Sequence, residues 1–166
     1  MIPVSPDSSA NLPQSPLAPE PGRASDAGVS VGIVLVSHSR ALAEAAVDLA
    51  RRLIVAVDVP VELAAGLADG GLGTDPGAVV EAVERLTERC EGVLVLADLG
   101  SGIMSAEMAL EMLDPALAER TRLSAAPFIE GLLGAYGAAG IGKDLQAVAT
   151  EADGAAEAKR SQVTAF

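Results

Sequence analysis

The chain has a single histidine, His38, and its place in the sequence suits it for chemistry. It follows the continuous apolar run of residues 31–36, which is typical of a buried parallel strand, and Ser39 after it can cap a helix. Open α/β sheets bind ligands beyond the carboxyl ends of their strands, and the free N–H groups at a helix start suit a phosphate. A group that changes charge near neutral pH is therefore predicted where an anion can dock. A histidine that only ends a strand and bonds a backbone carbonyl fits the same pattern.

Asp98 is the candidate partner of this imidazole. It follows the apolar run of residues 92–97, so it also ends a predicted strand. If the two strands are neighbours, its carboxylate can accept the N–H of one ring nitrogen, fix the tautomer and leave the other nitrogen as a nucleophile. A helix cap or a turn residue is the alternative, and the sequence alone leaves it open.

Ser37 and Ser39 flank the histidine. Neither serine lies in a Gly-x-Ser-x-Gly motif, and the chain has no second histidine to act as a base, so we do not expect either serine to be a nucleophile. We expect both to hydrogen-bond the imidazole or a bound oxyanion.

Glycine-rich turns supply the remaining candidates. Gly100 and Ser101 follow Asp98 in a turn whose backbone N–H groups can approach a phosphate, although such turns follow strands routinely. Gly73 and Thr74 can close the pocket, but the helix cap that Asp75 offers explains that segment more simply. The chain has no Gly-x-x-x-x-Gly-Lys-Ser/Thr sequence, so a standard nucleotide loop is not expected.

Composition excludes several classes of function. The formal net charge of -12 and the aromatic content of 2% argue against binding of nucleic acid or anionic membrane, and favour a basic protein partner. The single cysteine, Cys90, rules out an internal disulfide and fits a reducing cytoplasm. One cysteine and one histidine do not form a zinc-binding pattern, so no metal is expected. No secretory signal and no apolar stretch long enough to span a bilayer is recognised.

Strand and helix patterns alternate from residue 31 onward. After the first strand we expect helix 40–53, strand 61–65, a helix that starts at Pro76, strand 92–97, helix 103–113, strand 122–126, a glycine-interrupted helix from Pro127 and a last helix 144–152. Right-handed crossovers then give an α/β fold, a doubly wound and mainly parallel four-stranded sheet with helices on both faces. Periodicity does not fix the strand order, but the order 2-1-3-4 places His38 beside Asp98.

Few aromatic residues are available, so Ala, Val and Leu must fill the core. Glu130 is expected on a solvated helix face, with a subunit interface or pocket rim as the alternative. Tyr136 and three methionines are expected to fill the core or an interface: Met104, Met108 and Met112. Four apolar residues of the first helix are expected to share one face: Leu42, Ala46, Leu49 and Leu53.

Three segments are predicted along the chain. Residues 1–28 hold six of the ten prolines and are expected to be a disordered leader. Residues 29–152 form the folded domain, and residues 153–166 are expected to be a flexible tail.

Six short segments together closely resemble one family: residues 34–39, 64–66, 73–75, 98–101, 105–107 and 125–131. The family is DhaM, the phosphotransferase subunits of phosphoenolpyruvate-dependent dihydroxyacetone kinases. Its amino-terminal domain is similar to the IIA domain of mannose-type sugar phosphotransferase systems. The motifs occur in the same order with similar spacing, and the resemblance covers residues 31–152.

The resemblance implies a phosphoryl relay in the cytoplasm, serving glycerol metabolism. Enzyme I takes phosphate from phosphoenolpyruvate and passes it to HPr, and His38 accepts it as a phosphohistidine. The phosphoryl group then goes to ADP bound on DhaL, and the resulting ATP phosphorylates dihydroxyacetone on DhaK. A homodimer is also implied, with no cofactor bound by this chain. Longer family members continue into HPr-like and enzyme-I-like domains, so we expect separate proteins to supply the phosphate here.

Two alternatives remain open. One is the IIA component of a mannose-type sugar phosphotransferase system. The loop after Asp98 lacks the Phe-Gly-Gly-Ser-Pro pattern of those domains, which favours the dihydroxyacetone branch. The other is a non-catalytic regulatory module of the same fold, in which His38 is never phosphorylated.

Overall fold

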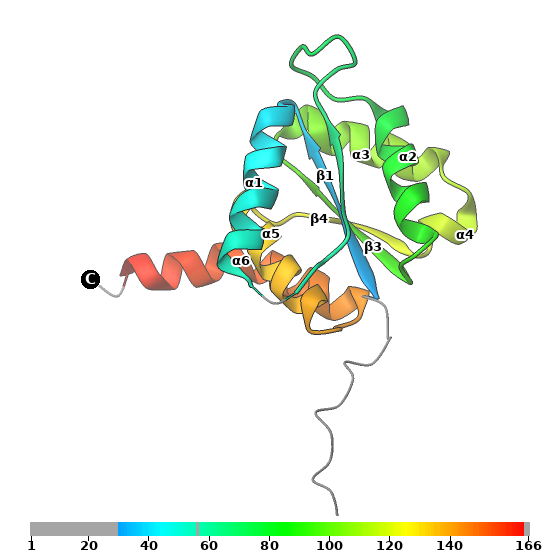
Figure 1. Ribbon diagram of the computed structural model, residues 1–166. Helices are drawn as coiled ribbons and strands as arrows, with labels where there is room; N and C mark the ends of the chain where they lie inside the picture. The colour runs from blue at the N-terminus through cyan, green and yellow to red at the C-terminus, as the bar shows by residue number, and fades with distance from the viewer. Residues whose placement is uncertain (1–29, 56, 165–166) are drawn as a thin grey trace, which may run out of the picture.

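A parallel four-stranded sheet lies at the centre of the molecule (Figure 1). The computed structural model describes residues 30–55 and 57–164, so the predicted leader lies outside the described residues. The strands are β1 (Val31–Ser37), β2 (Val61–Ala65), β3 (Gly92–Ala97) and β4 (Thr121–Ser124). All three pairings are parallel and the order is β2-β1-β3-β4, which confirms the predicted fold and strand order.

Helices cover both faces of the sheet (Figure 1). One face carries α1 (Arg40–Leu53), α5 (Phe128–Gly140) and α6 (Leu145–Thr164); the other carries α2 (Pro76–Thr87), α3 (Gly100–Met112) and α4 (Pro115–Ala118). Alternate residues of β1 divide between the two layers: Ile33 and Leu35 join the first core, and Val34 and Val36 the second. Both cores are mainly aliphatic, as the composition predicted.

Short polar side chains set the starts of the first two helices. Ser39 accepts a hydrogen bond from the Leu42 N–H, and Asp75 accepts one from the Gly77 N–H with Pro76 next to it. These caps explain where the two helices begin. The observed bounds of α1, Arg40–Leu53, confirm the prediction.

The apolar face predicted for α1 is correct for Ala46 and wrong for its three leucines. Small residues, among them Ala43, Ala46 and Ala50, lie against the sheet, whereas Leu42, Leu49 and Leu53 are exposed. Alanines bring the helix close to the sheet, and the bulkier leucines are then left along its flank. The sequence offered two overlapping apolar stripes on this helix, and size decided between them.

Two further predictions about packing have opposite outcomes. Tyr136 is fully buried, as expected, and its hydroxyl accepts a hydrogen bond from the Val59 N–H. Met104, Met108 and Met112 are exposed on α3, so the prediction of core filling is wrong for them. The other face of α3 packs through small residues, as α1 does.

The helix expected to end at Ala152 continues to Thr164, so the predicted tail is helical up to that residue. Its far end extends away from the sheet in Figure 1. Residues 153–164 contain alanines, which favour helix, and an ion pair between Glu157 and Arg160 one turn apart. Lys159 also pairs with Glu130 of α5, which ties the extension to the neighbouring helix.

Smaller differences concern the second half of the chain. α3 begins at Gly100 instead of residue 103, β4 lies one to two residues earlier than expected, and the four-residue helix α4 was not predicted. Within the described part of the chain, no helix is both long enough and apolar enough to cross a membrane.

The backbones of helices α5 and α6 come into close contact at Gly134. A Cβ atom built there would lie 2.9 Å from the carbonyl oxygen of Glu151. We expect Gly134→Ala to lower the free energy of unfolding by about 1–3 kcal/mol, because backbone atoms cannot move aside as a side chain can.

Gly137 of the same helix is the matched control for urea unfolding of both variants. A Cβ there meets only Ile54 at 3.8 Å, so Gly137→Ala should raise the free energy of unfolding by about 0.5–1 kcal/mol. Equal effects of the two substitutions would contradict the close approach at Gly134.

Candidate functional site

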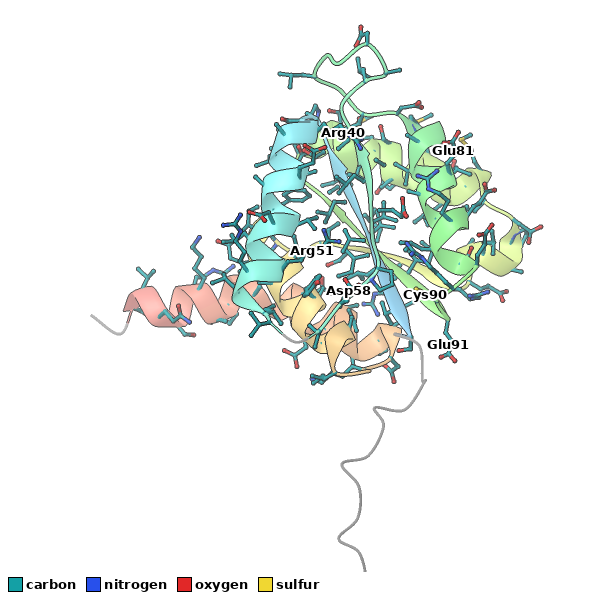
Figure 2. The ribbon with its side chains drawn as sticks, in the orientation of Figure 1. Arg40, Arg51, Asp58, Glu81, Cys90 and Glu91 are labelled. Atoms are coloured by element: carbon teal, nitrogen blue, oxygen red, sulfur yellow. The ribbon has the colours of Figure 1, made fainter. Side chains whose placement is uncertain are left out.

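His38 lies at the carboxyl edge of the sheet, directly after β1 and before the cap of α1. Its side chain is 26% exposed, so a docking protein can reach it. Figure 2 labels Arg40 at this end of the molecule and Cys90 toward the opposite end of the sheet. The buried thiol, whose pKa is raised by burial, is therefore remote from the histidine.

Asp98 lies beside His38 because β1 and β3 are neighbours, with Val36 paired to Ala97. Its carboxylate is only 7% exposed and accepts four hydrogen bonds. One oxygen accepts from the His38 ring Nδ1 at 2.9 Å and the Leu99 N–H at 2.7 Å; the other accepts from the Ser37 hydroxyl and the His38 N–H, both at 2.9 Å. The carboxylate thus holds both the main chain and the ring of His38.

These contacts determine the tautomer of the imidazole. Burial raises the pKa of Asp98, but hydrogen bonds from the main chain and side chain of His38, from Ser37 and from Leu99 outweigh it, and the net pKa is lowered. An ionised carboxylate only accepts hydrogen bonds, so Nδ1 of His38 carries the proton. In the neutral ring, Nε2 then has a free lone pair and faces away from Asp98.

Ser101 occupies the position in front of that lone pair. Its hydroxyl oxygen lies 2.5 Å from Nε2. Because Nε2 carries no proton, the Ser101 hydroxyl donates this hydrogen bond. Ser101 is in the first turn of α3, whose N-cap residue Leu99 makes no side-chain hydrogen bond to the helix. The first N–H groups of α3, including that of Gly100, therefore have no side-chain cap, and the helix start faces the reactive nitrogen.

The two serines next to His38 have separate positions. Ser37 is fully buried, donates its hydroxyl to Asp98 and accepts the N–H of Ser39 at 3.1 Å. Ser39 caps α1. Neither bonds the imidazole, so the ring contact expected of them is made by Ser101.

The loop of residues 66–74 reaches the same edge of the sheet. Gly73 donates its N–H to the carbonyl of His38 at 2.9 Å. The Thr74 hydroxyl lies 2.8 Å from the Ser105 hydroxyl and 3.3 Å from the carbonyl of Ser101. This loop thus holds His38 from one side and the start of α3 from the other.

Two further residues belong to this arrangement: sequence reasoning gave Ser105 no role in the site, and it took Gly102 only as part of the small-residue turn with Gly100 and Ser101. Ser105 is buried and anchors Thr74; its polar character inside an apolar helix was the available signal. Gly102 lies against Asp98, since a Cβ there would be 3.0 Å from a carboxylate oxygen. A side chain at Gly102 would press on the group that orients the ring.

Other candidates lie outside this cluster. Glu130 is paired with Lys159, and this hydrogen bond lowers the pKa of the carboxyl. Within residues 30–55 and 57–164, no three His, Cys, Asp or Glu side chains form a group that could hold a metal ion.

A family model described as "PTS system fructose IIA component" matches residues 32–149. Curated relatives from Klebsiella michiganensis and Escherichia coli K12 are both named "PEP-dependent dihydroxyacetone kinase, phosphoryl donor subunit DhaM". Each is 42% identical over 135 residues, which is 80% of this chain but only 28% of the relative, so the chain spans just over a quarter of their length.

Two shorter proteins match over most of their own length. A Listeria innocua relative with the same subunit name, from dihydroxyacetone kinase 2, is 37% identical over 61% of this chain and 79% of its own. The crystal structure of a protein of unknown function, EF1359, superposes with a TM-score of 0.68 at 29% identity, covering 75% of this chain and 93% of that one.

The lowered pKa of Asp98 predicts how stability depends on pH. The carboxyl titrates below its ordinary value near 3.9, so the charged form stabilises the fold above that pH, and this stabilisation is lost as the pH falls through the folded pKa. Asp98→Asn should lower the free energy of unfolding by about 1–3 kcal/mol at pH 7, because an amide cannot accept all four hydrogen bonds.

Urea unfolding of both proteins from pH 7 to pH 3 measures this difference, which should shrink below about pH 4. Glu107→Gln, at an exposed position on α3, controls for loss of a negative charge. A difference that stays constant over the whole range would contradict the role of the ionised carboxylate.

Proposed function

Because the chain belongs to the mannose-type IIA family and, within it, to the DhaM subunits, we propose that it carries a phosphoryl group on His38. It accepts the group from phosphorylated HPr and gives it to ADP bound on DhaL, for phosphorylation of dihydroxyacetone on DhaK. The observation that supports this most is the imidazole itself: Nδ1 is held by Asp98, and the lone pair of Nε2 accepts the Ser101 hydroxyl at the start of α3, which can turn away to a phosphoryl oxygen.

The transfer needs no proton movement on His38. The Nε2 lone pair attacks phosphorus as the P–N bond of the donor phosphohistidine breaks, and the electron pair of that bond returns to the donor ring. The product ring keeps its Nδ1 proton and becomes positively charged. The carboxylate of Asp98, 2.9 Å from Nδ1, stabilises that charge, much as a carboxylate stabilises an imidazolium in other enzymes.

The second transfer reverses the same chemistry. An oxygen of the ADP β-phosphate attacks phosphorus, the P–N bond on Nε2 breaks, and its electron pair returns to His38. The ring is again neutral with its proton on Nδ1. Asp98 therefore keeps one tautomer through both steps, so the carrier is ready for the next cycle.

The phosphoryl oxygens face hydrogen-bond donors of moderate strength. The Ser101 hydroxyl and the uncapped N–H groups at Gly100 and Ser101 can bind them, with the dipole of α3 adding to the attraction. Gly73 and Thr74 support this cradle by fixing the backbone, and Ser37 and Ser39 by fixing Asp98 and α1. A phosphate held in this way can still leave, as a carrier requires.

The dihydroxyacetone branch is preferred over a sugar-transporting IIA component. The relatives described above carry the name of the dihydroxyacetone kinase subunit, and the loop after Asp98 lacks the pattern of the sugar-transport domains. A homodimer, a location in the cytoplasm and the absence of a cofactor bound by this chain are part of the same proposal, and they depend on the family resemblance.

Phosphorylation of His38 is the direct test. The protein is incubated with phosphoenolpyruvate, enzyme I and HPr, and we expect one acid-labile, base-stable phosphate, absent from His38→Ala. ³¹P NMR should place it on Nε2, since Nδ1 is occupied by Asp98. Labelling that survives in His38→Ala would sink the site assignment, and a folded wild type that is never labelled would favour the regulatory module.

Asp98→Asn tests the orienting role in the same assay. The variant should remain folded but accept phosphate roughly 10²-fold more slowly or worse, because the amide neither fixes the tautomer nor balances the charge of the product ring. Asp114→Asn, the same substitution at the cap of α4 beyond the far end of α3, is the matched control and should change the rate far less. An unchanged rate in Asp98→Asn would refute the orienting role.

A further inference from the structure

A row of exposed methionines begins at the reactive nitrogen. Met104, Met108 and Met112 follow Ser101 at intervals of three, seven and eleven residues, which places all four on one face of α3. Their exposed fractions are 63%, 52% and 59%. The row of exposed methionines therefore starts one turn after Ser101, the residue that touches Nε2 of His38.

The row extends well beyond the chemistry. At 1.5 Å per residue, α3 carries it roughly 16 Å from Ser101 to Met112. At the near end, Leu99 and Leu72 are exposed at 62% and 76%. Figure 1 shows α3 at the same end of the molecule as the loop that contains Leu72. A protein that covers His38 therefore meets an apolar surface that continues along α3. We call this surface the methionine stripe (Leu99, Met104, Met108, Met112).

Acidic side chains border this surface. Glu107 and Glu111 are exposed on α3, and within the described residues neither takes part in an ion pair with a Lys, Arg or His side chain. The whole chain has a formal net charge of -12. A partner that binds here gains from positive charge around an apolar centre, and an acidic partner is repelled.

We propose that the methionine stripe is the docking surface for the protein that donates the phosphoryl group, and that this donor presents an apolar patch bordered by Lys or Arg next to its phosphohistidine. The inference rests on the proposed function, since a carrier must be covered by its donor during transfer. It adds the surface, its direction along α3 and the chemistry of the partner.

Charge favours the donor over the acceptor. The donor brings one charged phosphoryl group past Glu107 and Glu111, whereas the acceptor brings both phosphates of ADP and is repelled more strongly. Methionine suits a surface that must bind and release its partner quickly, because its flexible, polarizable side chain adapts to the partner without a fixed shape.

Met108→Lys is the variant to test, with Ile141→Lys as the matched control. Met108 makes none of the hydrogen bonds that hold His38, and its side chain is exposed. Ile141 is also apolar and 71% exposed, and it lies at the end of α5. Two donors are compared: phosphorylated HPr, which must dock, and phosphoramidate, which is too small to need the stripe.

With HPr as donor, we expect kcat/KM for labelling of Met108→Lys to fall about tenfold or more, mainly through KM. With phosphoramidate the rate should match the wild type, and Ile141→Lys should match it with both donors. Transfer from the labelled variant to DhaL loaded with ADP should change by less than about twofold. A double variant, Glu107→Gln and Glu111→Gln, should weaken the salt dependence of transfer from HPr.

The outcomes separate this inference from the proposed function. Wild-type rates for Met108→Lys with HPr, equal losses in the donor and acceptor arms, or loss of labelling by phosphoramidate would each overturn the docking surface while leaving His38 as the carrier. Wild-type protein that neither phosphoramidate nor HPr can label on His38 would instead overturn the proposed function.

Discussion

The four hydrogen bonds accepted by the carboxylate of Asp98 are the interaction on which the site depends. They join the ends of β1 and β3, because one oxygen holds the His38 N–H and the other holds its ring. Loss of this group would free the imidazole to rotate and to change tautomer. The carboxylate is nearly buried, so the four bonds must be made within the protein, and each comes from a residue at the edge of the sheet.

The strand order is what allows this interaction, and it accounts for how much the sequence could predict. Two continuous apolar runs ended in His38 and Asp98, and a parallel sheet in which they are neighbours must bring these residues together. The caps at Ser39 and Asp75 fixed two helix starts for the same local reason. Ser101 was also a candidate, but its contact with Nε2 depends on how α3 packs against the sheet beside β1. Local sequence patterns do not determine that packing.

The failures have a common physical cause. On α1 and α3 the sequence has small and large apolar residues on adjacent stripes, and periodicity gives both the same weight. The folded chain places the small residues against the sheet, since this lets the helices approach closely, and leaves leucines and methionines outside. Packing distance is a property of the whole domain. Contacts such as that of Thr74 with Ser105, which join a loop to a distant helix, are beyond local reasoning for the same reason.

The same packing rule links the interior to the surface around His38. If the methionines of α3 were buried, the helix would be held farther from the sheet and Ser101 would be displaced from Nε2. The small residues Gly102, Ser105 and Ala106 bring the helix start to the imidazole, and the large residues are thereby directed outward beside it. A close helix start and an apolar approach to the reacting nitrogen are thus two consequences of one arrangement, which needs no residue to be specialised for both.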